Sequence, residues 1–199
     1  MKNILMKIPI FFAGFFSFFG GEELAYKKDE AKMNAIVNHS IKQLSKRYKV
    51  IPIGRGGGNE DNKSRSEYVA FQLYEKLSKD EARVLIIEIV ELFLCNINSN
   101  KEIAPYLYNI PFTYENLEFR VFLYDKDGSD LYHPNLGLVS LTRIGTINFV
   151  TYKDESLDYA YNVEEPYEEA YRIATNREYP KNVQPPQNTS GAASQNHDK

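Results

Sequence analysis

The segment from Gly54 to Asn59 has the residue types best suited to binding a ligand, because it reads Gly-Arg-Gly-Gly-Gly-Asn. Successive glycine amides beside an arginine can cradle a phosphate or a carboxylate. The segment is neither a Walker loop nor a dinucleotide-binding fingerprint, since no Gly-Lys-Ser/Thr follows it and we expect no helix to begin directly after it. Two interpretations stay open. It is either a flexible connection between two antiparallel strands or an anion site formed by Arg55, Gly56, Gly57, Gly58 and Asn59.

A second candidate is an acidic run in which Asp125, Asp127 and Asp130 resemble the acids of a calcium-binding loop. A loop of the EF-hand type has glycine at its sixth position and glutamate at its twelfth, whereas here Gly128 is fourth and Leu136 is twelfth. Asp-Gly between strands is also a common turn signal. We expect a turn here, with a weak cation site as the alternative, and no motif in the sequence requires a metal or another cofactor.

Tyrosine is abundant, with fifteen residues in the chain, and several of them fall in an acidic section near the C-terminus. Tyrosine combines a large contact area with a polar tip and is enriched at protein interfaces. One hypothesis is that Tyr159, Tyr161, Tyr167 and Tyr171 form a surface for a partner. The alternative is that these side chains only cover the sheet edge and a small helix.

The sequence contains none of the common catalytic patterns, so we lean towards a protein that is not an enzyme. The histidines, His39, His133 and His197, are far apart and form no His-x-x-x-His or His-Glu-x-x-His pattern. Gly-x-Ser-x-Gly is missing, and no serine or cysteine has an evident base beside it. A net charge of −3 gives no reason to expect a nucleic-acid partner, which usually requires a basic surface.

Residues 1–25 have the features of an export signal. Lys2 and Lys7 precede an almost wholly apolar run, Ile8 to Phe19, in the order of the charged and apolar parts of a secretory signal. The run is shorter than the ~20 apolar residues of a typical transmembrane helix. No Ala-x-Ala cleavage site follows it, so the alternative is an uncleaved anchor that contacts the inner membrane through residues 4–21. We expect export to the periplasm, the cell surface or the medium.

Residues 26–179 predict a single domain, and residues 180–199, with three prolines and many Gln, Asn and Ser, predict a disordered tail. Hydrophobic periodicity indicates helices at 27–46 and 78–97, the second opened by a capping box of Ser78 and Glu81. Strands are expected at 50–53, 68–74, 117–124, 136–142 and 146–152, and a loop at 54–66. A short acidic helix with Pro166 in its first turn follows.

This order, α-β-β-α-β-β-β-α, predicts an α+β fold in which a mainly antiparallel sheet of about five strands packs on one central helix. We expect no βαβ unit, which argues against a dinucleotide-binding or P-loop fold. The single cysteine, Cys95, excludes an intrachain disulfide, so the domain depends on its hydrophobic core.

Three short motifs give the chain a resemblance to a known group of proteins. Asp80-Glu81-Ala82-Arg83, Pro105-Tyr106-Leu107 and Pro111-Phe112-Thr113 resemble segments of small exported proteins from chlamydia-like intracellular bacteria. The resemblance covers about residues 50–150. It implies export from a host-associated bacterium and carries over no catalytic residue.

Together these observations favour an exported, non-enzymatic module that binds an unknown protein or envelope partner. The first alternative is an enzyme or a binder of small anions that uses the glycine-rich residues 54–59. The second alternative is an accessory protein that its N-terminal segment tethers to the membrane.

The mass of the purified protein tests the predicted signal. We expect a soluble species from outside the cytoplasm that lacks about 20 to 25 N-terminal residues, because signal peptidase removes the apolar run. Intact-mass spectrometry of each cell fraction measures this. A full-length species in the membrane fraction would support the anchor, and a full-length cytosolic species would contradict export.

Overall fold

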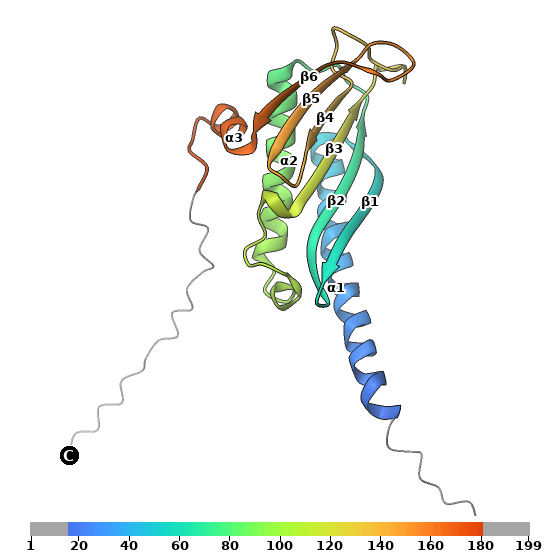
Figure 1. Ribbon diagram of the computed structural model, residues 1–199, viewed down its shortest axis with the longest axis vertical. Coiled ribbons are helices and arrows are strands. Elements are labelled where there is room, and N and C mark those ends of the chain that lie inside the picture. The colour runs from blue at the N-terminus through green and yellow to red at the C-terminus, as the bar shows by residue number, and fades with distance from the viewer. Residues whose placement is uncertain (1–15, 181–199) are drawn as a thin grey trace, which may run out of the picture.

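The computed structural model describes residues 16–180, with side chains from residue 30 onward, and shows an α+β domain (Figure 1). The predicted α+β class is therefore confirmed, whereas its finer features, about five mainly antiparallel strands on one central helix, are matched only roughly. Residues 181–199 of the predicted tail lie outside the described residues. In chain order the elements are α1 (Phe16–Tyr48), β1 (Ile51–Glu60), β2 (Lys63–Leu73), α2 (Lys79–Ser99), the 3-10 helices η1 (Ala104–Tyr106) and η2 (Tyr114–Asn116), β3 (Leu117–Leu123), β4 (Leu138–Leu141), β5 (Thr146–Tyr152), β6 (Tyr159–Pro166) and α3 (Tyr167–Thr175).

The strands form one six-stranded sheet in the order β1-β2-β3-β4-β5-β6, and α1 and α2 pack together on one face of it (Figure 1). Neighbouring strands are antiparallel except β2 and β3, which run parallel. The sheet is therefore mixed and has one strand more than predicted. The expectation of no βαβ unit is wrong, because α2 returns the chain along the sheet and lets β3 run in the same direction as β2.

The predicted loop at 54–66 is also wrong, because these residues form most of a hairpin between β1 and β2. Asp61 and Asn62 make its two-residue turn, with φ of 50° and 59°. Turns with two left-handed residues match the twist of a hairpin, and Asp and Asn tolerate this conformation better than most residues. The glycines of β1 are part of the strand because their backbone groups pair with β2. β1 lies at the edge of the sheet, where a strand needs few side chains for packing.

The sixth strand, β6, was missed in the sequence because it lies in an acidic segment that leads into a helix. Its Tyr159, Tyr161 and Val163 alternate with other residues at the period of a strand. The strand pairs antiparallel with β5 along its whole length. Pro166 ends β6 and directly precedes α3, so it does not lie in the first turn of that helix as predicted.

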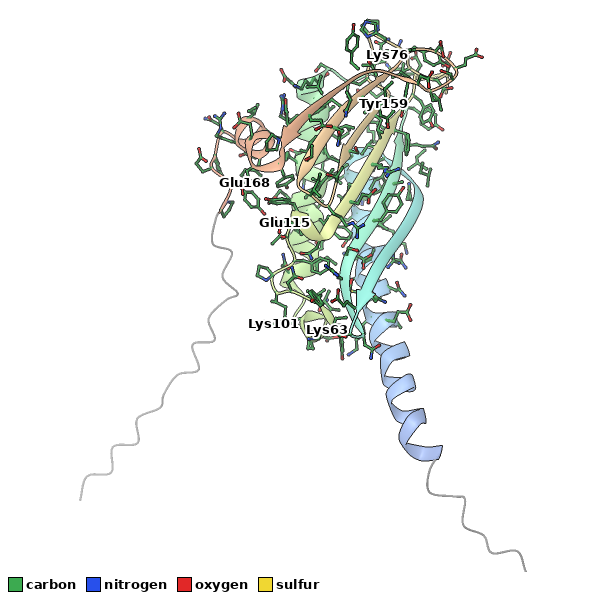
Figure 2. The ribbon with its side chains drawn as sticks, viewed as in Figure 1. Lys63, Lys76, Lys101, Glu115, Tyr159 and Glu168 are labelled. Atoms are coloured by element: carbon green, nitrogen blue, oxygen red, sulfur yellow. The ribbon has the colours of Figure 1, made fainter. Side chains whose placement is uncertain are left out.

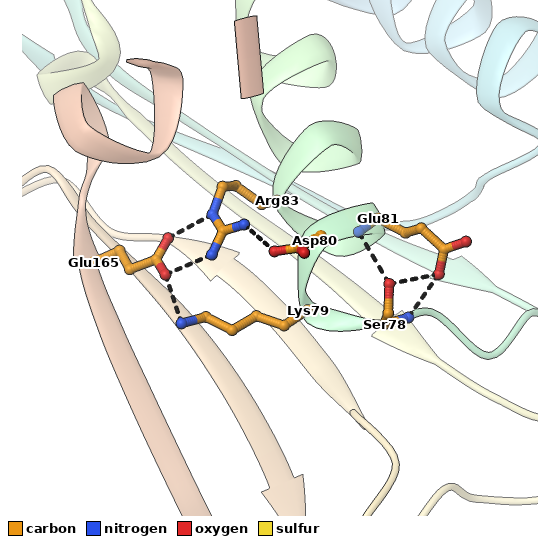
Figure 3. A network of polar contacts seen from close by, with 6 residues as sticks. All are labelled: Ser78, Lys79, Asp80, Glu81, Arg83 and Glu165. Atoms are coloured by element: carbon orange, nitrogen blue, oxygen red, sulfur yellow. Dashed lines mark hydrogen bonds and ion pairs between the residues drawn. The ribbon is translucent and has the colours of Figure 1, made fainter. Parts of the chain in front are cut away.

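Helix α2 is central, as predicted, and it buries an apolar stripe made of Ala82, Ile86, Ile87, Ile89, Val90, Phe93, Leu94 and Ile97. The predicted capping box is confirmed. The Glu81 amide donates to Ser78 Oγ, and the Ser78 amide donates to the Glu81 carboxylate (Figure 3). These two bonds satisfy amide groups that the first turn of a helix otherwise leaves unpaired.

A buried ion pair connects α2 to β6 (Figure 3). Arg83 is only 5% exposed and donates two hydrogen bonds, both of 2.7 Å, to the two carboxylate oxygens of Glu165. Lys79 also contacts Glu165, at 2.5 Å, and Asp80 accepts a further bond from Arg83. The hydrogen bonds from Arg83 are the main reason that the pKa of Glu165 falls to about 2.

Helix α1 carries the end of the predicted export signal, residues 16–25, into the domain without a break. Its first buried side chain among those described is Met33, and Val37, Ile41 and Leu44 continue the buried stripe. The beginning of α1 extends past the sheet (Figure 1). Residues 1–15 of the predicted signal lie outside the described residues. Between residues 16 and 180, no helix has both the length and the apolar character needed to cross a membrane.

Replacing Arg83 by alanine should lower the free energy of unfolding at pH 7 by about 3 kcal/mol, because Glu165 would keep a largely buried charge with only Lys79 beside it. The exposed pair of Arg172 and Glu169 provides a control, and Arg172→Ala should lower the free energy of unfolding much less, because solvent screens this pair. Urea unfolding measures both variants.

The same variant should change the response to acid. The pKa of Glu165 is lowered from 4.5 to about 2 in the folded protein. The ion pair therefore contributes its full stabilisation of the fold above pH 4.5 and loses it as the pH falls towards 2. Arg83→Ala should therefore lose less stability between pH 5 and pH 2 than the unaltered protein. Equal acid dependence in both proteins would show that the pair does not control this response.

Candidate functional site

A pocket of about 350 Å³ lies between α1 and the β1–β2 hairpin. Most of the residues that line it are polar or glycine: Glu30, Asn34, Arg55, Gly56, Gly57, Asn59, Asn62, Ser64 and Glu67, with Met33 and Tyr106. Its volume falls within the ~300–1,000 Å³ that is usual for small-molecule sites. The hairpin places the glycine-rich segment directly opposite α1, so two elements that adjoin in the sequence make both walls.

Arg55 is held in this pocket by two asparagines of α1. Its Nη1 donates to Asn38 Oδ1 at 3.0 Å, and its Nη2 donates to Asn34 Oδ1 at 2.6 Å. In the hairpin Arg55 pairs with Val69, a buried residue, which places its side chain on the face of the sheet that the helices cover. Amide oxygens neutralise no charge, so the guanidinium keeps its positive charge and its remaining donors.

Glu67 is the most buried ionisable group of the pocket, with only 5% of the residue exposed. Its Oε1 accepts a 3.0 Å hydrogen bond from Ser64, and its Oε2 lies 3.9 Å from Arg55 Nη2. The second distance is too long for a hydrogen bond. Burial raises the pKa of Glu67, and the Ser64 hydrogen bond and the Arg55 charge only partly oppose this effect.

The glycines of β1 have different packing. An added Cβ at Gly57 would lie 2.8 Å from the Ser66 carbonyl oxygen and 3.4 Å from Glu67 Oε2. At Gly58 it would lie 2.9 Å from Ser66 Oγ, whereas at Gly56 its nearest neighbour would be a Tyr68 ring carbon at 3.7 Å. Glycine is therefore required at 57, where the backbone comes close to β2 and to the buried carboxylate.

Four of the five residues predicted as a ligand site line the pocket, namely Arg55, Gly56, Gly57 and Asn59. The fifth, Gly58, lies instead beside a smaller pocket of about 210 Å³ that includes Glu118 and Arg143. Sequence reasoning missed Ser64 because it placed residues 54–66 in a loop, and it missed Glu67 because the next predicted strand began at residue 68. A glutamate at an inward position of the strand that follows was the available signal.

Asp125, Asp127 and Asp130 lie in a turn, and other groups already bind them. Asp125 contacts Lys76 at 2.5 Å, and this bond is the main reason that its pKa is lowered. Asp127 accepts hydrogen bonds from the amide and the hydroxyl of Ser129, and Gly128 has a φ of 89°. In the part of the chain that the structure describes, no three potential metal ligands come together. The turn is the interpretation that this geometry favours.

The four tyrosines of the predicted partner surface lie in two separate places. Tyr159 and Tyr161 are 58% and 62% exposed on β6, and Tyr159 lies far along the sheet from Lys63 at the hairpin tip (Figure 2). Tyr167 is buried, and its hydroxyl donates a 2.7 Å hydrogen bond to Glu91 of α2. Tyr171 packs with it around Tyr179, so this second pair holds α3 in place.

Comparison of the chain with protein-family models, curated proteins and solved structures found no match. The geometry of the pocket is therefore the basis for any assignment.

A methyl group at Gly57 should damage the pocket, whereas one at Gly56 should not. Gly57→Ala should destabilise the protein by about 1–3 kcal/mol, because the added carbon overpacks the contact with the Ser66 carbonyl. Gly56→Ala, in the same strand and with ordinary contacts, should change stability by less than about 1 kcal/mol. Thermal and urea unfolding measure both. Equal losses would contradict the proposed close packing.

Proposed function

We propose that this chain is an exported binding module and that the pocket between α1 and the β1–β2 hairpin holds a small polar ligand. The observation that supports this most directly is the position of Glu67, whose buried carboxylate faces a pocket and lies 3.9 Å from Arg55, beyond hydrogen-bond distance. Burying a charge without complete pairing is costly, and such groups are concentrated at functional sites.

The lining of the pocket suits a ligand that offers both donors and acceptors. Arg55 supplies a positive charge that Asn34 and Asn38 hold in position, and Glu67 and Ser64 supply acceptors on the neighbouring strand. Gly57 leaves the space beside Oε2 free. This arrangement supports the small-ligand interpretation of residues 54–59. The pocket carries charges of both signs, however, so it differs from the site for anions that the sequence suggested.

Export is part of the proposal and rests on the sequence. The apolar run that begins at Ile8 follows two lysines, and three motifs resemble exported proteins of chlamydia-like bacteria. Cleavage near residues 20 to 25 would leave in place the segment of α1 that starts at Met33 and packs on the domain. If the segment is not cleaved, the domain is an accessory protein held at the membrane.

A second candidate function is binding of a protein or envelope partner at β6. This strand ends the sheet, and Tyr159 and Tyr161 expose more than half of their surface there. Exposed tyrosines at an unpaired strand edge suit recognition of an extended chain.

Replacing Arg55 by alanine should weaken ligand binding about tenfold or more, because a charge-assisted contact is lost. We would screen amino acids, sugars, nucleosides, amines and organic acids at millimolar concentration and follow backbone amide signals by NMR. At least one compound should shift the amides of Gly56, Gly57 and Ser64.

Arg65→Ala is the matched control, because Arg65 lies on the same hairpin, pairs with Glu60 and does not line the pocket. This variant should bind the selected compound like the unaltered protein. If no compound in the screen shifts the pocket amides, the proposed function is wrong.

A further inference from the structure

We infer that the ligand is an α-amino acid or a short peptide with a free α-amino group, bound through its ammonium by Glu67 and through its carboxylate by Arg55. This inference rests on the proposed function and adds the chemical class of the ligand. It depends on three features of the pocket: the sign of its charges, their separation and the space beside them.

The charges of the pocket exclude a simple anion or a simple cation as the best ligand. Glu30 and Glu67 both line it, so an anion at Arg55 would also face two carboxylates. A ligand with only positive charge would face Arg55, whose guanidinium is fixed by two asparagine oxygens. A zwitterion can satisfy both sides, with each of its charges next to a residue of opposite sign.

The separation of these charges matches adjacent ligand groups. Arg55 Nη2 and Glu67 Oε2 are 3.9 Å apart, and they do not form a hydrogen bond with each other. The ammonium and carboxylate of an α-amino acid are attached to one carbon atom, so they too lie close together. An ammonium at Oε2 would donate to this oxygen, and the remaining N–H groups of Arg55 would bind the carboxylate.

The space next to these groups accepts a ligand. Gly57 presents no side chain towards Oε2, and the methyl group of an alanine there would reach within 3.4 Å of that oxygen. Met33 and Tyr106 add apolar surface to the same pocket, where the rest of an amino acid or dipeptide can pack.

NMR titration with the twenty common amino acids and glycylglycine tests the inference. We expect at least one of them to shift the amides of Gly56, Gly57 and Ser64. The tightest compound is then compared with its N-acetyl derivative, which has no ammonium, and with its amide, which has no carboxylate. Each derivative should bind about tenfold more weakly.

Two variants connect each loss to one residue. Glu67→Gln should remove the preference for the free amine over the N-acetyl derivative, and Arg55→Ala should remove the preference for the acid over the amide. Glu155→Gln removes one exposed charge from the connection before β6 and should preserve both preferences.

Folding of the Glu67→Gln variant is checked independently by circular dichroism and thermal unfolding. It should have a higher Tm than the unaltered protein at pH 7, because an amide replaces a charge that burial disfavours. Ser64→Ala, which removes the donor to Oε1, is a second variant and should weaken binding of the amino acid less than Glu67→Gln does.

The possible failures can be told apart. If other polar compounds shift the pocket amides and no amino acid or dipeptide does, the ligand class is wrong and the pocket remains a binding site. The same conclusion follows if the N-acetyl derivative binds as well as the free amine. If nothing shifts these amides, the proposed function itself is wrong.

Discussion

The packing of α2 against the sheet is the constraint on which the rest of the structure depends. The helix forms the crossover between β2 and β3, and its apolar stripe fills the core between the sheet and α1. Polar contacts from the same helix fix the other elements: Arg83 binds Glu165 of β6, and Glu91 binds Tyr167 of α3. Because these contacts come from one rigid helix, the sheet and α3 are positioned relative to it.

Much of this fold can be predicted from the sequence because α2 has strong local signals. Ser78 and Glu81 define its start, and an unbroken apolar stripe defines its buried face. The direction of β3 could not be predicted in this way, since the parallel pairing depends on contacts between segments far apart in the chain. Local composition also hid β6, where Glu164 and Glu165 suggested a helix although the tyrosines alternate as in a strand.

The candidate site was predicted only in part, for a related reason. Arg55 and its glycines were recognised because glycine-rich segments beside a cation are locally unusual. Glu67 was not, because it lies just before the strand predicted at 68–74, although it continues the alternation of Val69 and Phe71. Its role appears only when the Asp61-Asn62 turn brings β2 against β1 and places Glu67 near Arg55. Sites built from facing strands and a helix depend on register, which single residues do not encode.

The same register explains why the pocket exists at all. If β1 carried larger side chains, they would fill the space between β1 and α1. An apolar residue could then replace Glu67 at little cost in stability. The glycines do the opposite, since Gly57 keeps space beside the carboxylate and Arg55 remains too far away to neutralise it by a direct hydrogen bond. Stability alone does not favour that combination, because it keeps a buried carboxylate beyond hydrogen-bond distance of the nearby guanidinium. A ligand that donates to Glu67 would offset this penalty, and this is the physical reason for proposing that the pocket binds one.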